Sequence, residues 1–436
     1  MPLLFDLLYL TLLALLSPWL IARAIRTGRY RRDLAAKLFG AARIANPDGR
    51  PVAWFHGVSV GEIHLLQTVV AAFRKRHPEW RIAVSSTTDT GLAEARARFL
   101  DCAVIAYPFD FSWACAAAIR AVNPAIIVLA ESELWPNFLA CAAARKVPVA
   151  VINARMSPRS FARLNRAQSL ARRFLFRRIA KFAVQSEESA ERFRALGVPE
   201  CQLVVTGSVK YDGAAGDRDT PKARELREWM DIPESSIVWV AGSTHAPEEG
   251  IVLGIFARLR LRFPQLRLVL VPRHPDRFAE VAALVEKSGL PFVRRSAPKV
   301  VADPAVILLD SVGELGAAWG LADLGYTGGS LDGKRGGQSM IEPAGFGVPT
   351  LFGPHIWNFR DAARRLIEAG GAETIRTPDE LEAKLAAWIG DPALRTRMGD
   401  AARRLVREQQ GATERTLDVL DAVMAGSARS LRRPAT

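Results

Sequence analysis

Short apolar runs alternate with longer amphipathic stretches along most of the chain. From Ile63 onward, for example, apolar residues recur at spacings of three and four, which is the pattern of a helix with one buried face. Strands that alternate with helices in this way predict a parallel sheet covered by helices on both faces. In the first half of the chain, the strand-like runs are Val52–His56, Ile82–Ser85, Val104–Tyr107, Ala125–Leu129, Val147–Ile152, Phe182–Val184 and Leu203–Thr206.

The same rhythm restarts after a polar stretch, Gly207 to Thr220, which we interpret as a linker. The tail from about Pro378 to Ala425 is helical and amphipathic. Two similar α/β halves joined by a short linker predict a ligand held between them. In the second half, helical patterns follow the strand-like runs Ile237–Ala241, Leu266–Val271, Val306–Leu309, Leu324–Tyr326 and Thr350–Phe352.

The N-terminus differs from the rest of the chain. Leu7 to Ala22 carries no charge, and the apolar run reaches back to Leu3 with only Asp6 interrupting it. Since about 20 apolar residues span a bilayer as a helix, residues 1–30 are predicted to be a membrane anchor, with a helix lying in the interface as the alternative. By the positive-inside rule, the basic residues that follow place the rest of the chain on the cytoplasmic side of the membrane. These residues are Arg23, Arg26, Arg29, Arg31 and Arg32.

The 436-residue chain has a formal net charge of +14, and this basic excess implies an anionic partner. Nine of the basic residues lie between Arg155 and Lys181, with apolar residues among them. Beside a membrane anchor, this pattern favours docking to anionic lipid over a solvated helix face. Nucleic acid is less favoured because no helix-turn-helix, zinc-finger or RNA-binding motif is present. The four cysteines form no C-x-x-C pair, which indicates a reducing compartment and no zinc site.

The first strand-like run leads into His56-Gly57-Val58-Ser59-Val60-Gly61-Glu62, just before a helix. Ligands bind at such strand ends in open α/β folds, and a carboxylate in the first turn of the helix is a usable general base. The alternative is that Ser59 and Glu62 form only a capping box, S-x-x-E. His56 on its own is more typical of a structural histidine at a strand end.

Other polar residues also follow predicted strands. Glu131 closes the run Ala125–Leu129, where it either orients a base or contacts a sugar hydroxyl, or is a surface residue at a helix start. Ser243 lies between a strand and a helix, where backbone N–H groups bind phosphate. Arg273, followed by His274, is suited to a phosphate or a carboxylate.

A glycine-rich segment in the second half begins like a P-loop at Gly328, but it has Arg335 where that motif needs Ser or Thr, which argues against an NTPase. Downstream, the pair Gly336-Gly337 permits close approach of a ligand, and Glu342 is suited to the two ribose hydroxyls of a nucleotide. Asp217-Arg218-Asp219 matches the metal-binding D-x-D of some glycosyltransferases. It lies in the predicted linker, where solvated charge is the simpler interpretation, so no metal site is predicted.

Taken together, these motifs resemble those of the 3-deoxy-D-manno-octulosonic acid (Kdo) transferases of lipopolysaccharide synthesis. The resemblance covers nearly the whole chain in order, including the apolar N-terminus. It is carried by His56–Glu62, Glu131–Asn137, Asn153–Ser157, Gln185–Glu187, Gly207–Asp212, Pro272–His274 and Gly336–Asn358.

The resemblance implies two Rossmann-like domains in a glycosyltransferase B fold, and an inverting transfer that needs no metal or other cofactor. The implied donor is CMP-Kdo, and the implied acceptor is a lipid A precursor such as lipid IVA. Glu62 matches the family's catalytic base, and Glu131 matches its second essential glutamate. The expected donor site consists of Ser243, Arg273, His274, Gly336, Gly337, Gln338, Ser339 and Glu342, and the expected acceptor site of His56, Ser59, Gly61 and Arg155.

We expect residues 31–212 to form the acceptor domain, and residues 213–426 the CMP-Kdo domain with the C-terminal helices. One departure concerns the donor segment, where Gln338-Ser339-Met340-Ile341 replaces the His-Asn and Pro-Leu usual in the family. Gln and Ser keep polar contacts available for catalysis. Two alternatives remain open: a membrane-associated transferase of the same fold that uses another nucleotide sugar, and a non-catalytic protein that binds a lipid surface.

Overall fold

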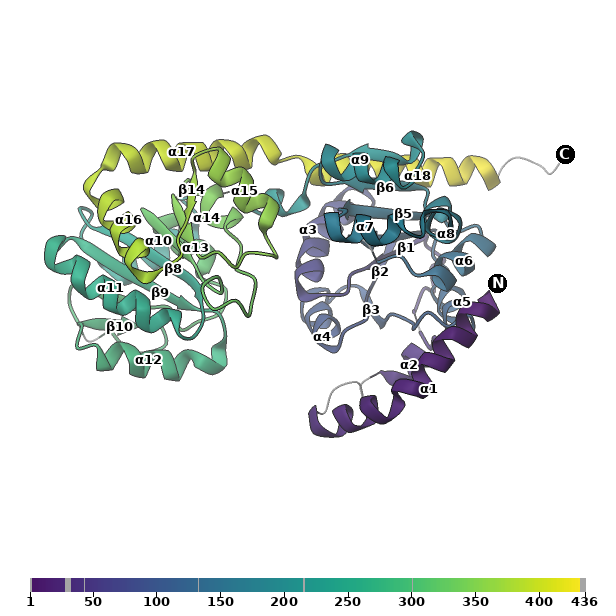
Figure 1. The fold of residues 1–436 in the computed structure, drawn as a ribbon, viewed down its shortest axis with the longest axis horizontal. Coiled ribbons are helices and arrows are strands. Elements are labelled where there is room, and N and C mark those ends of the chain that lie inside the picture. Colours follow the sequence, from purple (N-terminus) through teal and green to yellow (C-terminus); the bar gives the residue numbers. More distant parts are fainter. Residues whose placement is uncertain are drawn as a thin grey trace. The chain divides into compact units, whose positions relative to one another are not determined.

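The computed structural model describes residues 2–27, 33–42, 44–131, 133–214, 216–299 and 301–431. The chain forms two compact units (Figure 1). Unit 1 consists of Met1–Asp212 and Gln410–Thr436, and unit 2 consists of Gly213–Gln409.

Unit 1 is built on a seven-stranded sheet in the order β3-β2-β1-β4-β5-β6-β7, with every pair of neighbours parallel. The strand order reverses between β1 and β4, as in a Rossmann fold. The strands are β1 (Val52–His56), β2 (Arg81–Ser86), β3 (Ala103–Ala106), β4 (Ile126–Ala130), β5 (Val149–Ala154), β6 (Lys181–Val184) and β7 (Leu203–Val205).

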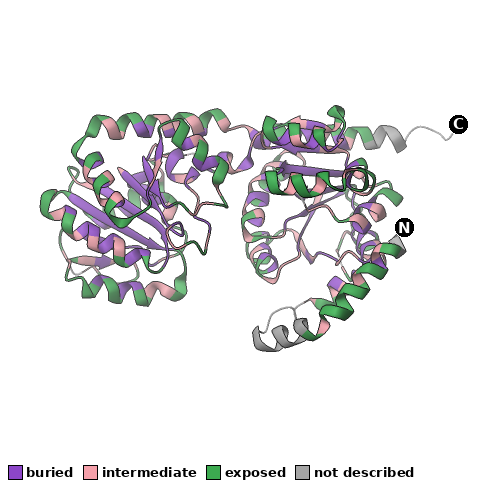
Figure 2. Cartoon of the chain, viewed as in Figure 1, coloured by how far each residue is buried: buried purple, intermediate pink, exposed green. Residues whose placement is uncertain are grey.

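Helices cover both faces of this sheet, and the strands between them are buried (Figure 2). Successive strand residues point to opposite faces, so Trp54 and Phe55 belong to two different apolar layers. The helices are α1 (Pro2–Thr27), α2 (Leu34–Phe39), α3 (Val60–Arg76), α4 (Asp89–Arg98), α5 (Ser112–Val122), α6 (Pro136–Ala144), α7 (Pro158–Asn165), α8 (Gln168–Phe174), α9 (Glu187–Ala195) and α18 (Ala412–Leu431), with 3₁₀ turns η1 (Phe176–Arg178), η2 (Glu200–Gln202) and η3 (Val209–Ala214).

Unit 2 repeats the design with a second parallel sheet, in the order β10-β11-β9-β8-β12-β13-β14, which reverses between β8 and β12. Its strands are β8 (Ile237–Thr244), β9 (Leu266–Pro272), β10 (Phe292–Arg294), β11 (Val306–Leu308), β12 (Leu324–Thr327), β13 (Thr350–Phe352) and β14 (Ala372–Thr374). Its helices are α10 (Pro221–Met230), α11 (Glu248–Arg262), α12 (Phe278–Lys287), α13 (Leu315–Leu321), α14 (Ile341–Gly345), α15 (Arg360–Glu368), α16 (Pro378–Gly390) and α17 (Pro392–Gln409), with the 3₁₀ turn η4 (Pro275–Arg277).

The prediction of two Rossmann-like domains is confirmed, and two details of the second half differ from it. The edge strands β10 and β14 were not predicted, because each has three residues and only one of them is buried, which leaves too short a pattern. The strand β8 extends to Thr244, so Gly242 and Ser243 end the strand rather than follow it.

The C-terminal helix α18 packs against α3, β5 and β6 of unit 1, whereas the sequence groups it with the second half. Its apolar residues, among them Leu417 and Leu420, complete the same apolar layer as Phe55. Asp212 fixes the start of this segment, because its carboxylate accepts the backbone N–H groups of Gly411 (2.7 Å) and Thr413.

The helix α1 packs against α5 and α6. Its one acidic residue, Asp6, is buried and accepts hydrogen bonds from the backbone N–H of Ser112 (2.8 Å) and the side-chain amide of Asn137 (3.0 Å). The Tyr9 hydroxyl donates to Asp110 (3.0 Å). Eight leucines of the same helix are exposed: Leu4, Leu7, Leu8, Leu10, Leu12, Leu13, Leu15 and Leu16.

Among the residues that the structure describes, no helix is both long enough and apolar enough to cross a membrane. The expected boundary between residues 30 and 31 lies outside the described residues. So do three of the basic residues that followed the apolar run, Arg29, Arg31 and Arg32.

Asp6→Ala is expected to lower the free energy of unfolding by about 1–3 kcal/mol, because it leaves the half-buried Ser112 backbone N–H and one of the two N–H groups of the buried Asn137 amide without an acceptor. Asp6→Asn keeps an acceptor oxygen and should cost less. Leu12→Ala, on an exposed position of the same helix, is the control and should change little. Urea denaturation of the three variants measures this, and equal midpoints for Asp6→Ala and Leu12→Ala would contradict it.

Candidate active site

Each sheet carries predicted site residues at the point where its strand order reverses. In unit 1, Glu62 follows β1 and Glu131 follows β4, and these two strands are neighbours in the sheet. The carboxyl ends of parallel strands at such a point form the crevice in which open α/β folds bind ligands. The two glutamates that lie far apart in the sequence are therefore brought to one edge of the sheet.

Glu62 lies in the first turn of α3 and takes part in a capping arrangement. Ser59 is the N-cap, and its hydroxyl accepts a hydrogen bond from the Glu62 backbone N–H (3.3 Å). The Glu62 carboxylate accepts from the Val58 backbone N–H (2.9 Å) and from the Ser59 hydroxyl (2.9 Å). The predicted capping box is therefore present. The Glu62 carboxylate is nevertheless only half-buried at the strand end.

The surroundings of Glu62 change its proton affinity. Burial raises the pKa of Glu62, and the negative charges of Glu131 and Glu133 raise it further, against the opposing effect of hydrogen bonds from Val58 and Ser59. A glutamate with a raised pKa is better matched to accept a proton near neutral pH than an ordinary one. Glu62, Glu131 and Glu133 therefore lie within electrostatic reach of one another.

Glu131 faces two cations at the end of β4. Its backbone is left-handed, with φ 57°. Its carboxylate lies 3.4 Å from the Arg155 guanidinium and 3.4 Å from the Lys210 ammonium group. The sequence predicted Arg155 as a site residue, whereas Lys210 and Glu133 stood within motifs that carry the family resemblance but were given no role. Lys210 falls in the stretch interpreted as a linker, which forms the turn η3, and only the three-dimensional structure joins it to Glu131.

The predicted acceptor residues do not all lie at the surface. His56 is fully buried, its ring stacks on Tyr107 with centroids 3.6 Å apart, and its Nδ1 lies 2.9 Å from the Ser85 hydroxyl. Burial lowers its pKa to about 3, so the ring is neutral near pH 7. Ser59 and Gly61, by contrast, are exposed in the first turn of α3.

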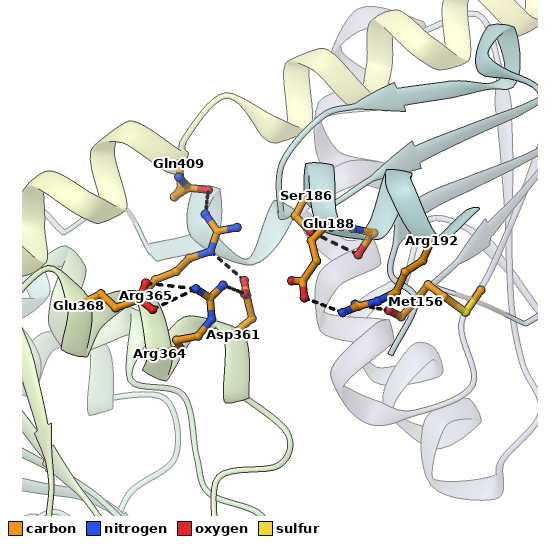
Figure 3. Close-up of polar contacts among 10 residues, drawn as sticks. Met156, Ser186, Glu188, Arg192, Asp361, Arg364, Arg365, Glu368 and Gln409 are labelled. Atoms are coloured by element: carbon orange, nitrogen blue, oxygen red, sulfur yellow. Dashed lines mark hydrogen bonds and ion pairs between the residues drawn. The ribbon is translucent and has the colours of Figure 1, made fainter. Parts of the chain in front are cut away.

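Arg192 of α9 supports the segment that carries Arg155. It donates to the Met156 backbone carbonyl (2.8 Å) and to the Glu188 carboxylate (2.5 Å), as Figure 3 shows. The direction of the chain after β5 is therefore fixed by a side chain from the neighbouring helix.

In unit 2, the loops after β8 and β12 are fixed by one buried carboxylate, that of Glu248 at the start of α11. It accepts hydrogen bonds from the backbone N–H groups of His245 (3.0 Å), Gly329 (2.8 Å) and Ser330 (3.1 Å) and from the Tyr326 hydroxyl (2.9 Å). Sequence analysis did not single out Glu248. A carboxylate in a first helical turn resembles an ordinary cap, although its place directly after a strand end was an available signal.

The loop after β12 folds back on itself, so the glycine pair lies beside the start of the loop. Gly337 N–H donates to the Gly329 carbonyl (2.8 Å), and Gln338 N–H donates to the Gly328 carbonyl (3.1 Å). Gly336 has φ 82°, and a Cβ there would lie 2.3 Å from the Trp357 indole. Glycine is therefore required at position 336 by both backbone and space.

Several predicted donor residues gather at this edge of the second sheet. The Gln338 amide lies 3.4 Å from His245 Nε2, and the His245 ring lies 5.1 Å from that of His274. Burial raises the pKa of Glu342, and the positive charge of Arg273 opposes that shift, so these two residues are also near one another.

The remaining predicted donor residues lie on the adjoining segments. Ser243 is buried at the end of β8 with φ 55°, and Ser339 is half-buried just before α14. Arg273 and His274 are exposed after β9. The site thus offers an arginine, a histidine and glycine backbone at the carboxyl ends of the strands, which is a composition suited to phosphate groups.

Comparison with known proteins finds relatives that match most of the chain. A family profile described as 3-Deoxy-D-manno-octulosonic-acid transferase (kdotransferase) matches residues 26–213. A 3-deoxy-D-manno-octulosonic acid transferase of Haemophilus influenzae is 34% identical over 402 residues, which cover 90% of this chain and 92% of that protein. The chain belongs to the Kdo transferase family. It is a glycosyltransferase.

Other relatives extend the comparison. A Kdo transferase of Bordetella pertussis is 33% identical over 396 residues, covering 87% of this chain and 89% of that protein. Among solved structures, a glycosyltransferase from Rickettsia africae has the same fold, with a TM-score of 0.54 at 12% identity, and it covers 86% of this chain and 99% of that chain. The family match therefore includes both Rossmann-like units of this Kdo transferase.

Replacing Glu248 with Ala in this transferase should lower the free energy of unfolding of unit 2 by at least about 3 kcal/mol, because several buried donors lose their acceptor at once. Hydrogen exchange should become faster at Gly329 and Ser330. Glu286→Ala, at an exposed position of α12, is the control. Unchanged exchange rates in Glu248→Ala would show that the loop is held by other contacts.

Proposed function

We propose that this chain transfers Kdo from CMP-Kdo to a hydroxyl group of a lipid A precursor, lipid IVA, with inversion and without a metal ion. Glu62 is the general base, and Glu131 is the second essential carboxylate. The observation that carries the proposal is the pairing of these two residues at the strand-order reversal of unit 1, where the pKa of Glu62 is raised. The names of the relatives support Kdo as the transferred sugar.

In this scheme the acceptor hydroxyl oxygen attacks the anomeric carbon of Kdo, and Glu62 takes its proton. The bond from that carbon to the CMP phosphate oxygen breaks, and CMP leaves with the electron pair. A sugar hydroxyl is a poor nucleophile near neutral pH, and a positioned base contributes about 10²–10⁴-fold to such a step. Arg155 and Lys210 form ion pairs with Glu131 and orient its carboxylate at the same strand end.

The donor side uses the residues at the reversal of the second sheet. Glu342 binds the ribose hydroxyls, and Arg273 and His274 bind the phosphate or the Kdo carboxylate, whose charges they stabilise. Gly336 and Gly337 admit the ligand close to the backbone. Gln338 supplies a polar contact where the family usually has histidine, which supports retained donor binding despite the departure.

The lipid acceptor fits the exterior of unit 1. We assign α1 to the cytoplasmic face of the inner membrane, where its exposed leucines contact acyl chains and the helix serves as the anchor. Phe5 of α1 contacts Phe174 of α8 edge to face, with centroids 5.4 Å apart. The basic stretch therefore adjoins the leucine helix, where it binds anionic headgroups. Besides Arg155 of the site, its exposed arginines are Arg159, Arg163, Arg166, Arg172, Arg173 and Arg177.

The donor and acceptor assignments are separated by two variants. Glu342→Ala should weaken CMP binding by about 1–3 kcal/mol, the cost of losing a charged hydrogen-bond partner. Glu62→Gln should bind CMP normally and transfer no sugar, because it keeps the shape and loses the base. Calorimetric titration of CMP and mass spectrometry of lipid IVA incubated with CMP-Kdo measure the two effects. Wild-type turnover by Glu62→Gln would leave Glu62 with only its capping role. Normal CMP affinity in Glu342→Ala would show that Glu342 does not bind the nucleotide.

The pH dependence of transfer tests the base directly. A general base acts only when ionised, so a raised pKa of Glu62 places the fall of activity on acidification at a higher pH than for an ordinary glutamate. Glu133→Gln removes a negative charge that raises this pKa, so the fall should move to lower pH. Glu191→Gln, at an exposed position of α9, should leave the profile unchanged. A shift to higher pH in Glu133→Gln would exclude Glu62 as the titrating base.

A further inference from the structure

Unit 2 contains a cavity of about 290 Å³ that lies at the opposite edge of the sheet from the donor loops. Two of its lining residues, Asp323 and Pro349, directly precede β12 and β13, so the cavity opens at the amino ends of these strands. The donor loops, in contrast, follow the carboxyl ends of β8, β9 and β12. None of the predicted site residues lines this cavity.

Three arginines line the cavity, and backbone carbonyl groups hold each of them. Arg218 donates to the carbonyls of Phe346 (2.9 Å) and Ala322 (3.0 Å), and Arg403 donates to Phe346 (3.2 Å). Arg395 donates to the carbonyl of Trp388 (2.7 Å). Carbonyl bonds position a guanidinium group without neutralising its charge.

Within the described part of the chain, none of these three arginines forms an ion pair with a carboxylate, although many other arginines do. Arg403 Nε is buried and has no hydrogen-bond partner there. A buried donor without a partner is costly, and here that cost falls on a residue that lines the cavity.

The acidic residues of the cavity do not balance this charge. The Asp323 carboxylate accepts the Val238 backbone N–H (2.8 Å), and burial raises its pKa. Asp400 lies at the exposed rim. Burial lowers the pKa of Arg218, and the positive charge of Arg403 lowers it further, against the effect of Asp323. Asp323 thus offsets part of the charge of Arg218, but three guanidinium groups still face two carboxylates, which leaves one positive charge for an anion to balance.

We propose that this cavity binds a phosphate-class anion, either free phosphate or pyrophosphate or the phosphate group of a small molecule, independently of the donor site. Guanidinium groups fixed in direction suit phosphate oxygens because their N–H donors form paired bonds with them. Close packing brings α17 up to the cavity, since a Cβ on Gly399 would lie 2.3 Å from the Gly347 carbonyl. Arg218, the centre of the Asp217-Arg218-Asp219 motif, acquires a role as an anion ligand rather than part of a metal site.

The test is calorimetric titration of pyrophosphate, and separately of phosphate, into the full chain with and without saturating CMP. With CMP present, one site should remain, and its affinity should fall with rising salt. Arg395→Gln and Arg403→Gln should each weaken it at least tenfold. Arg404→Gln, the exposed neighbour of Arg403 in α17, is the matched control and should bind as the wild type does.

Thermal unfolding provides a second readout if one variant is unstable. Pyrophosphate should raise the melting temperature of the wild type and of Arg404→Gln, but not that of Arg395→Gln. Arg395 suits this test because its side chain donates hydrogen bonds to backbone carbonyls at the end of α16. No binding to the CMP-saturated wild type, or an equal loss in Arg404→Gln, would overturn the proposal. These outcomes do not depend on whether Kdo is transferred, so failure here leaves the proposed reaction untouched.

Discussion

In both units, a carboxylate that accepts hydrogen bonds from backbone N–H groups at the start of a helix fixes the loop on which the site depends. Glu62 does so after β1, and Glu248 does so after β8. The first turn of a helix leaves N–H groups unpaired and carries partial positive charge, so a carboxylate is stable there. Because β1 and β8 border the strand-order reversals, the same local interaction shapes the crevice of each sheet.

The two carboxylates differ in how many hydrogen bonds they accept within the protein and in how exposed their oxygens are. Glu248 is buried and is used by donors from two loops, so its oxygens have no room for substrate. Glu62 accepts two local bonds and stays half-buried beside Glu131 and Glu133. One position is a structural support, whereas the carboxylate at the other is only half-buried. What separates them is solvent access and the charge of the neighbours, not their place in the helix.

Much of this arrangement could be predicted from the chain because it depends on local pattern. Apolar runs locate the strands, and a polar residue directly after a run, such as Glu131, lies at a sheet edge. Long-range partners carry no such signal. The period of α18 shows that one face is buried but not that it packs on unit 1, and the polar stretch containing Lys210 gives no indication of Glu131. The hydrogen bonds that Glu248 accepts were missed for the same reason, since their donors, the backbone N–H groups of Gly329 and Ser330, are distant in sequence.

The bond from Asn137 to Asp6 connects the N-terminal helix to the segment that follows Glu131 and Glu133. Asn137 is the second residue of α6, and the loop before that helix carries both carboxylates. The leucine-rich helix is therefore not a tether that can be exchanged for any other apolar sequence. A chain shortened to begin after it would expose the Ser112 backbone N–H and the Asn137 amide to water, beside the start of α6. Improved solubility and an intact loop before α6 are then competing aims, and a homologous helix without an acid at this position would have to hold α6 in some other way.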